Sequence, residues 1–210
     1  MRVHCAGTAT DIGKTWVGAA TLAELRSGGV TVAARKPAQS FDPAERGPRD
    51  ADVLAAASGE HPDDVCLPHR HYGVAMAPPM AADVLDRPPF TVADLVGELR
   101  WPAPPVDVGW VEGVGGPRSP IAHDGDGVDL VRALEPDRVV VVADAGLGTI
   151  NAVLLSVGPY AALGHDPIVV LNRYDAGNDL HRRNLAWLAE RVGLHVVTTI
   201  PELAGVLGVS

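Results

Sequence analysis

The chain has 210 residues, of which 47% are hydrophobic, and a formal net charge of −9 at pH 7. A chain of this length can bury one substantial core, so we expect a single domain over residues 1–210. The acidic balance without a basic stripe argues against nucleic acid and against a membrane surface, because both attract clustered Lys and Arg. Cys5 and Cys66 are too few for a disulfide framework, and no leader or spanning segment is visible. We therefore expect a cytoplasmic protein that acts on small molecules.

A phosphate-binding loop is the clearest motif. An apolar run at 3–6 leads into GTATDIGKT at 7–15, which an amphipathic pattern follows at 14–26. Such a loop between a strand and a helix turns backbone N–H groups onto phosphate oxygens, sets Lys14 against the terminal phosphates and offers the Thr15 hydroxyl to Mg²⁺. The commonest form has a glycine where this chain has Thr8. A simple glycine turn is the alternative.

Lysine is rare in this chain. Of the 17 basic residues, 15 are arginine, and the other two are Lys14 and Lys36. Since arginine serves wherever a general positive charge is needed, we predict that both lysines are chemically required. Lys36 follows a predicted strand at 30–34, and ligands of open parallel sheets bind at the carboxyl ends of strands. The two lysines can therefore contact one anion, although a solvated Lys36 stays an alternative.

Strand and helix patterns alternate along the rest of the chain. We expect strands at 106–111, 139–143, 168–171 and 196–199, and helices at 50–58, 80–85, 92–99, 178–192 and from the turn at 144–151 to about 163. Six or seven such units without hairpin signals predict an α/β fold with a doubly wound, mostly parallel sheet of about seven strands. The proline-rich segment 61–105 is the least regular. Its His69 and His71 could bind a metal but are more often solvated, and Asp124 to Gly127 is predicted to form a turn.

Two acids are candidates for a metal site. Glu112 ends the predicted strand at 106–111 and precedes the glycine-rich segment 113–116. A carboxylate in that place, beside a phosphate loop, can hold Mg²⁺ directly or through water. Asp50 begins the predicted helix at 50–58, where capping of the helix is the alternative role.

The motifs occur in the order seen in the dethiobiotin synthetase family, which the chain resembles over nearly its whole length. They are GTATDIGKT (7–15), KPAQS (36–40), DA (50–51), VEGVGG (111–116), LGTIN (147–151) and NR (172–173). The resemblance implies an ATP- and Mg²⁺-dependent ring closure by a homodimer. One amine of 7,8-diaminononanoate forms a carbamate with CO₂ or bicarbonate, ATP phosphorylates the carbamate, and the other amine displaces the phosphate.

The resemblance also implies roles for individual residues. Lys14, Lys36, Thr10 and Ser40 would be catalytic, while Thr15, Asp50 and Glu112 would hold Mg²⁺. ATP would contact Thr10, Asp11, Ile12, Gly13, Lys14, Thr15 and Trp16, with Asn172 and a loop at Pro201 and Glu202 facing the adenine. The amine substrate would contact Lys36 and Ser40, and its carboxylate would reach Gly148, Thr149 and Asn151 across the dimer interface.

The chain departs from the family pattern on the substrate side. The family usually has aspartate at Ala9, glycine at Phe41, histidine at Ala152 and the sequence Ser-Pro-His where this chain has Ala-Pro-Pro, ending at Pro79. These changes leave open a paralogue that activates another amine. A nucleotide-driven switch or partitioning ATPase is a further alternative, although such proteins typically carry an additional lysine early in the phosphate loop.

Overall fold

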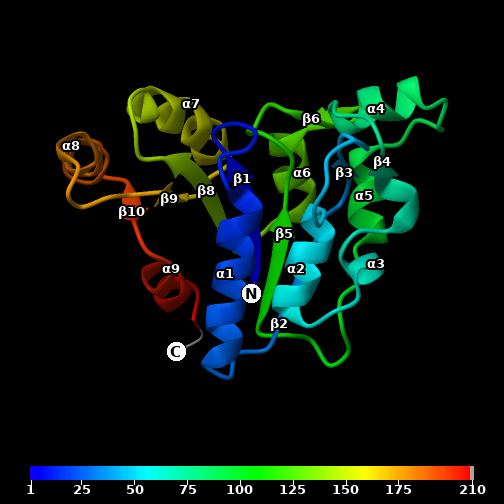
Figure 1. Cartoon of the computed structure of the whole chain (residues 1–210), viewed down its shortest axis with the longest axis horizontal. Helices are drawn as coiled ribbons and strands as arrows, with labels where there is room; N and C mark the ends of the chain where they lie inside the picture. Colours follow the sequence, from blue (N-terminus) through cyan, green and yellow to red (C-terminus); the bar gives the residue numbers. More distant parts are fainter. Residues whose placement is uncertain (209–210) are drawn as a thin grey trace.

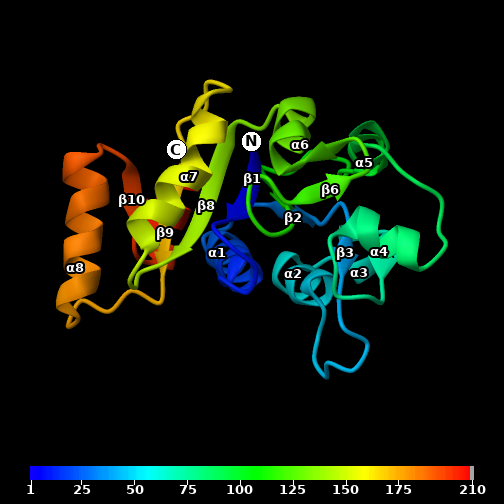
Figure 2. The same cartoon turned by 90° about the horizontal axis from the view of Figure 1, so that it is seen from above.

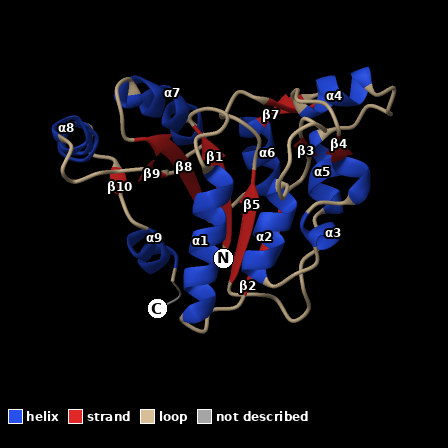
Figure 3. Ribbon diagram, in the orientation of Figure 1, coloured by secondary structure: helices blue, strands red, loops and turns tan. Residues whose placement is uncertain are grey.

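The central sheet of the computed structural model, which describes residues 1–208, has six parallel strands in the order β10-β9-β8-β1-β5-β2 (Figures 1 and 3). They are β1 (Arg2–Gly7), β2 (Val32–Arg35), β5 (Val108–Glu112), β8 (Arg138–Asp144), β9 (Ile168–Asn172) and β10 (His195–Val197). The predicted α/β class and parallel sheet are confirmed. The expected number of about seven strands is too high by one, because the other short strands form separate two-stranded sheets.

Helices cover both faces of the sheet, as Figure 2 shows from above. One face carries α1 (Lys14–Ser27), α2 (Asp50–Ser58) and α9 (Ile200–Leu207); the other carries α6 (Gly127–Leu134), α7 (Thr149–Ala161) and α8 (Asp179–Ala186), which continues into a π-helical turn, η2 (Trp187–Arg191). The alternation of side chains along β8 supplies both cores. Val140 and Val142 pack toward α1, whereas Val139 and Val141 pack toward α7.

The proline-rich segment 61–105 folds, together with short elements on either side of it, around a third apolar cluster, which includes Tyr72, Phe90 and Ile121. It contains α3 (Pro62–Val65), the 3₁₀ turn η1 (Pro68–Arg70), α4 (Pro78–Val84), α5 (Val92–Glu98) and two small sheets, β3 (Gln39–Ser40) with β4 (His71–Tyr72) and β6 (Pro120–Ala122) with β7 (Gly125–Asp126). Proline occupies the first turn of both α3 and α4, where its missing N–H leaves no helical hydrogen bond unmade.

Two expectations about secondary structure need correction. The turn predicted from Asp124 to Gly127 is confirmed only at Asp124, because Gly125 and Asp126 form β7 of an antiparallel hairpin and Asp126 then caps α6. The expected loop at Pro201 and Glu202 is the first turn of α9, because the Thr199 hydroxyl accepts from the Glu202 N–H while the Glu202 carboxylate accepts from the Thr199 N–H. Within residues 1–208, every helix is too short or too polar to cross a membrane.

Candidate active site

The loop after β1 wraps closely around its own centre. A Cβ at Gly7 would lie 2.8 Å from the Ile12 side chain and 2.9 Å from the Ala9 carbonyl, so only glycine fits there. Asp11 and Gly13 adopt left-handed backbone conformations, with φ of 56° and 93°. The buried Lys14 Nζ donates to the Ala9 carbonyl at 3.2 Å. The loop is therefore already curled in the form that a phosphate group requires.

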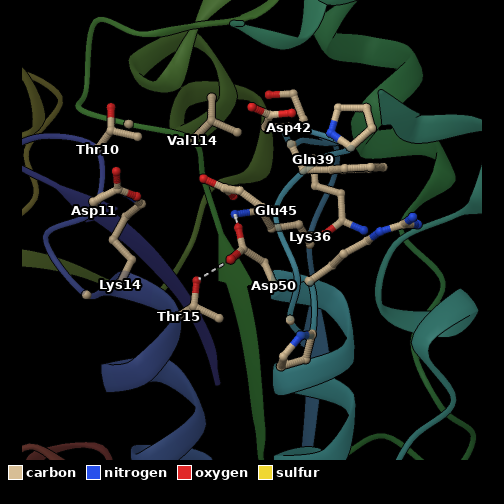
Figure 4. Close-up of a pocket in the computed structure, with 18 of the residues that line it drawn as sticks. Thr10, Asp11, Lys14, Thr15, Lys36, Gln39, Asp42, Glu45, Asp50 and Val114 are labelled. Carbon is tan, nitrogen blue, oxygen red and sulfur yellow. Dashed lines mark hydrogen bonds and ion pairs between the residues drawn. The ribbon is translucent and has the colours of Figure 1, made fainter. Parts of the chain in front are cut away.

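Lys36 lies at the centre of a charged cluster at the carboxyl edge of the sheet. Its Nζ is 2.6 Å from Glu112 Oε1 and 2.7 Å from Asp50 Oδ2, and the side chain is only 3% exposed. The Thr15 hydroxyl lies 2.9 Å from both Asp50 Oδ1 and Glu112 Oε1. Figure 4 shows Lys14 and Thr15 on one side of this cluster and Asp50 on the other. The structure thus brings together four residues that lie far apart in the sequence.

The charges in this cluster shift the pKa values of its members. Burial alone would lower the pKa of Lys36, but the carboxylates of Glu112 and Asp50 outweigh it and hold that pKa above its usual range. Burial opposes the ionisation of Asp50, yet the ammonium of Lys36 lowers the pKa of Asp50 overall. The pKa of Lys14 is lowered by burial and then by the like charge of Lys36. An anionic ligand would relieve the repulsion between the two lysines.

Replacement of Asp50 by asparagine is expected to change the acid stability of the chain. Because the pKa of Asp50 in the folded chain lies below its ordinary value of 3.8, its stabilising charge is complete above that value and is lost as the pH falls through the folded pKa. Below about pH 4 the wild type should therefore lose unfolding free energy more steeply than Asp50→Asn. Urea unfolding between about pH 5 and pH 2 measures this difference. Asp64→Asn, at an exposed position of α3, is the control, and parallel curves for wild type and Asp50→Asn would contradict the expectation.

The structure assigns helix capping to a neighbour of Asp50. In α2 the Asp52 carboxylate accepts from the Arg49 N–H at 2.8 Å, whereas Asp50 directs its carboxylate to Thr15 and Lys36. The sequence left Asp50 either a role at the metal site or a role as helix cap, and this geometry favours the metal site.

The donor atoms of this cluster suit a magnesium ion. Glu112 is completely buried, and its Oε2 has no hydrogen-bond partner within residues 1–208. A buried carboxylate oxygen without a partner is costly unless a ligand or ion supplies one. Together with the Thr15 hydroxyl and the Asp50 carboxylate, it offers only oxygen ligands, which is the chemistry that Mg²⁺ prefers.

A cavity of about 600 Å³ opens beside this cluster. Residues from the predicted site that line it are Thr10, Asp11, Gly13, Lys14, Thr15, Lys36, Ser40 and Asp50. Gln39, which belongs to the motif at 36–40, and Arg49 also line it, although neither was predicted as a site residue. The Arg49 guanidinium lies 3.9 Å from the centre of the Phe41 ring, so the residue that departs from the family pattern forms part of the wall. The Ser40 hydroxyl donates to the Met76 carbonyl.

A second cavity, of about 510 Å³, lies on the other side of the phosphate loop. Gly13, Trp16 and Asn172 of the predicted nucleotide site line it; its lining residues that were not predicted are Val17, Val170, Arg173, Tyr174, Thr198, Thr199 and Ile200. Pro201 and Glu202 follow directly in α9 and are absent from this wall as the structure describes it. The aromatic ring of Tyr174 and the capping-box sequence that begins at Thr199 are signals that could have indicated this wall.

The predicted carboxylate site lies in the turn between β8 and α7. Gly148 begins α7 in a left-handed conformation, and the Thr149 hydroxyl donates to the Asp144 carbonyl. Asn151 is exposed, and the side chain of Leu147 is 91% exposed. These residues share the strand-end edge with the phosphate loop, but they belong to neither of the two cavities described above.

A strand, a curled glycine loop, a buried lysine and two carboxylates beside it define a phosphate-loop nucleotide-binding protein. In keeping with this, the family model described as an AAA domain matches residues 2–209. An ATP-dependent dethiobiotin synthetase of Haloferax mediterranei is 35% identical over 202 residues, which cover 93% of this chain and 82% of that protein. Another from Rhodococcus jostii is 36% identical over 202 residues, covering 95% and 85%. The chain belongs to the dethiobiotin synthetase family.

Among solved structures, the signal recognition particle receptor FtsY of Elizabethkingia anophelis aligns with a TM-score of 0.49 at 14% identity. The alignment covers 93% of this chain and 56% of that chain.

Proposed function

We propose that this chain is an ATP-dependent ligase that closes the ring of dethiobiotin from 7,8-diaminononanoate. Its membership of the family supports the reaction, in which CO₂ converts one amine to a carbamate, ATP phosphorylates a carbamate oxygen with release of ADP, and the second amine displaces phosphate. The observation that carries the proposal is the position of Lys36. A buried ammonium is held at 2.6 Å and 2.7 Å from two carboxylates beside a phosphate loop, and it could serve a carbamate once Mg²⁺ offsets the charge of those carboxylates.

In this proposal the protein acts by positioning and by neutralising charge. Lys14 would contact the terminal phosphates, and Lys36 would stabilise the carbamate and the phosphoryl group in transfer. Thr10 and Ser40 would contact the substrate or the phosphates from the wall of the larger cavity. Thr15, Asp50 and Glu112 would hold Mg²⁺, which, when bound, offsets the negative charge of the phosphates.

The remaining nucleotide contacts are assigned to the second cavity. Trp16 lines it and is well exposed, which suits a ring that stacks on a base. Asn172 also lines it and donates to the Ile12 carbonyl of the phosphate loop, while Pro201 and Glu202 follow the lining residue Ile200 in α9. We keep the single domain over residues 1–210 and the cytoplasmic location as predictions.

A homodimer is part of the proposal, because exposed apolar side chains gather beside the expected carboxylate site. Leu147 and Leu155 are 91% and 69% exposed, and Leu154 lies between them along the chain at 40%. Single exposed leucines are ordinary, but three of them on one helix and the turn before it suit a contact between subunits. Gly148, Thr149 and Asn151 of one subunit would then reach the substrate of the other.

Replacement of Leu155 by glutamate is expected to dissociate the dimer, because it introduces a charge into an apolar contact. Light scattering after size exclusion should give the monomer mass, and turnover should fall at least about tenfold as the carboxylate site is lost. Leu180→Glu is the matched control, since Leu180 is also exposed but belongs to α8. A wild-type monomer, or a Leu155→Glu dimer with full turnover, would contradict this interface.

The experiment that tests the function is a phosphate-release assay with MgATP and bicarbonate, with and without 7,8-diaminononanoate. Release should depend on the diamine, and the product should carry the cyclic urea. If the diamine gave no stimulation, the proposal would be wrong. Because the Phe41 ring and Arg49 form part of the cavity wall, the assay includes diamines of other lengths, whose preferential turnover would favour the paralogue instead.

A further inference from the structure

Two consecutive residues at the end of β9 hold two consecutive carbonyls of the phosphate loop. Asn172 Nδ2 donates to the Ile12 carbonyl at 2.9 Å, and Arg173 Nη2 donates to the Asp11 carbonyl at 3.4 Å. These contacts join segments about 160 residues apart in the sequence. Asn172 lies directly against the loop, because a Cβ at Gly13 would lie only 2.2 Å from its Nδ2. Its side chain is therefore part of the support on which the loop rests.

The pair is itself held in place. Asn172 Oδ1 accepts from the Arg173 N–H at 3.0 Å, which fixes the orientation of the amide. Arg173 has a φ of 58°, a conformation that is rare for an arginine and persists only where its surroundings impose it. Its guanidinium also lies 3.6 Å from the Asp144 carboxylate at the end of β8. Two neighbouring strands thus direct one polar pair toward the phosphate loop.

The geometry of the peptide bond gives these contacts a consequence for the ligand. In a trans peptide the C=O and the following N–H point in opposite directions. When the carbonyls of Asp11 and Ile12 are held toward β9, the N–H groups of Ile12 and Gly13 must point the other way. Within residues 1–208 neither N–H donates to another group of the protein. Backbone N–H groups fixed in this manner bind phosphate oxygens without reorganising.

We propose that Asn172 and Arg173 are positioning residues, a clip that holds two peptide planes of the phosphate loop so that their N–H groups face the nucleotide phosphates. The inference rests on the proposed nucleotide site. It gives Asn172 a task in addition to the contact with adenine that the family resemblance implies, since Asn172 also lines the second cavity. A clip affects every ligand that carries the polyphosphate chain, whereas a base contact affects only ligands that carry the base.

The test compares the binding of MgATP and of magnesium tripolyphosphate, measured by calorimetry on the full chain. Asn172→Ala removes a hydrogen bond to the buried side of the loop, so it should weaken both ligands by about tenfold. The loss for tripolyphosphate measures the clip by itself, because this ligand carries no base. Weaker binding of MgATP with unchanged binding of tripolyphosphate would make Asn172 a base reader and overturn the clip.

The matched control is Asn184→Ala. Asn184 is also buried, and its Nδ2 donates to the carbonyls of Ala145 and Gly146, so it braces a different strand-end loop. This variant should bind tripolyphosphate as the wild type does. An equal loss in Asn184→Ala would show that the effect of Asn172→Ala is general loosening of the fold and would overturn the proposal.

A second variant keeps the test decisive if Asn172→Ala does not fold. Arg173→Gln changes a largely exposed side chain and removes the charge that reaches the Asp11 carbonyl. It should weaken both ligands by a similar factor of about three to ten, and more strongly at low salt. Unchanged affinity for tripolyphosphate, or a wild type that binds MgATP but not tripolyphosphate, would refute the clip. Diamine-dependent turnover is measured separately, so the binding experiment still tests the clip if the proposed reaction is not observed.

Discussion

Lys36→Arg is expected to lose turnover by about a hundredfold or more while the chain remains folded. Lys36 Nζ occupies a buried position at 2.6 Å from Glu112 and 2.7 Å from Asp50, a space that fits a compact ammonium. The guanidinium of arginine is planar and larger, so it keeps the charge but cannot place it where the ammonium lies. Steady-state phosphate release measures the loss, and circular dichroism checks the fold.

The control for this variant is Arg138→Lys, the reverse exchange at the exposed start of β8, which should turn over normally. Turnover of Lys36→Arg within about threefold of the wild type would mean that any positive charge suffices at this position. In that case the rarity of lysine would have no chemical meaning at position 36, and Lys36 would have no specific part in phosphoryl transfer.

Glu112→Gln is expected to raise the Mg²⁺ concentration needed for half-maximal turnover by at least about tenfold and to lower the maximal rate by about a hundredfold. The change keeps the size of the side chain and an oxygen toward Thr15, but it removes the negative charge and the pair with Lys36. A neutral amide is a weaker ligand for a hard cation than a carboxylate. Turnover measured across a Mg²⁺ titration gives both quantities.

Glu60→Gln provides a matched control, because Glu60 also pairs with a buried cation, Arg35 at 2.8 Å, but lines neither of the two cavities described above. Its Mg²⁺ dependence should match the wild type even if its melting temperature falls. A Glu112→Gln enzyme with an unchanged Mg²⁺ dependence would remove Glu112 from the proposed metal site and leave it as a partner of Lys36 alone.

The central site was readable from the sequence because its signals are local. Gly-Lys-Thr at 13–15, Lys36 after one buried strand and Glu112 after another each follow from the pattern of a few residues. The general rule that parallel strands end at one edge then predicts that they converge. The structure has Thr15 and Lys36 within hydrogen-bond distance of Glu112, and it supports the prediction that the helix at 50–58 begins with Asp50.

The starts of α6 and α9 differ from the prediction because their capping motifs were overlooked, and the contact of Asn172 was missed because it joins distant segments. The glycines around Asp126 were interpreted as a turn, yet Asp126 and Asp129 form a capping box and the apolar residues that follow belong to α6. Thr199 and Glu202 form the same motif and mark the start of α9. The contact of Asn172 with the phosphate loop has no local signal, because it depends on which strands lie side by side.

The scarcity of lysine also gives the chain a selective chemical handle. Lys14 and Lys36 are the two lysines of the sequence, and both are almost completely buried, at 7% and 3% exposure. The pKa of Lys14 is lowered, which increases its share of the uncharged, nucleophilic form. Among the lysine side chains, a reagent that acylates amines should therefore favour Lys14 in the phosphate loop. Modification of the peptide that contains Lys14 would then report the state of that loop, and a nucleotide bound as proposed would shield it from the reagent.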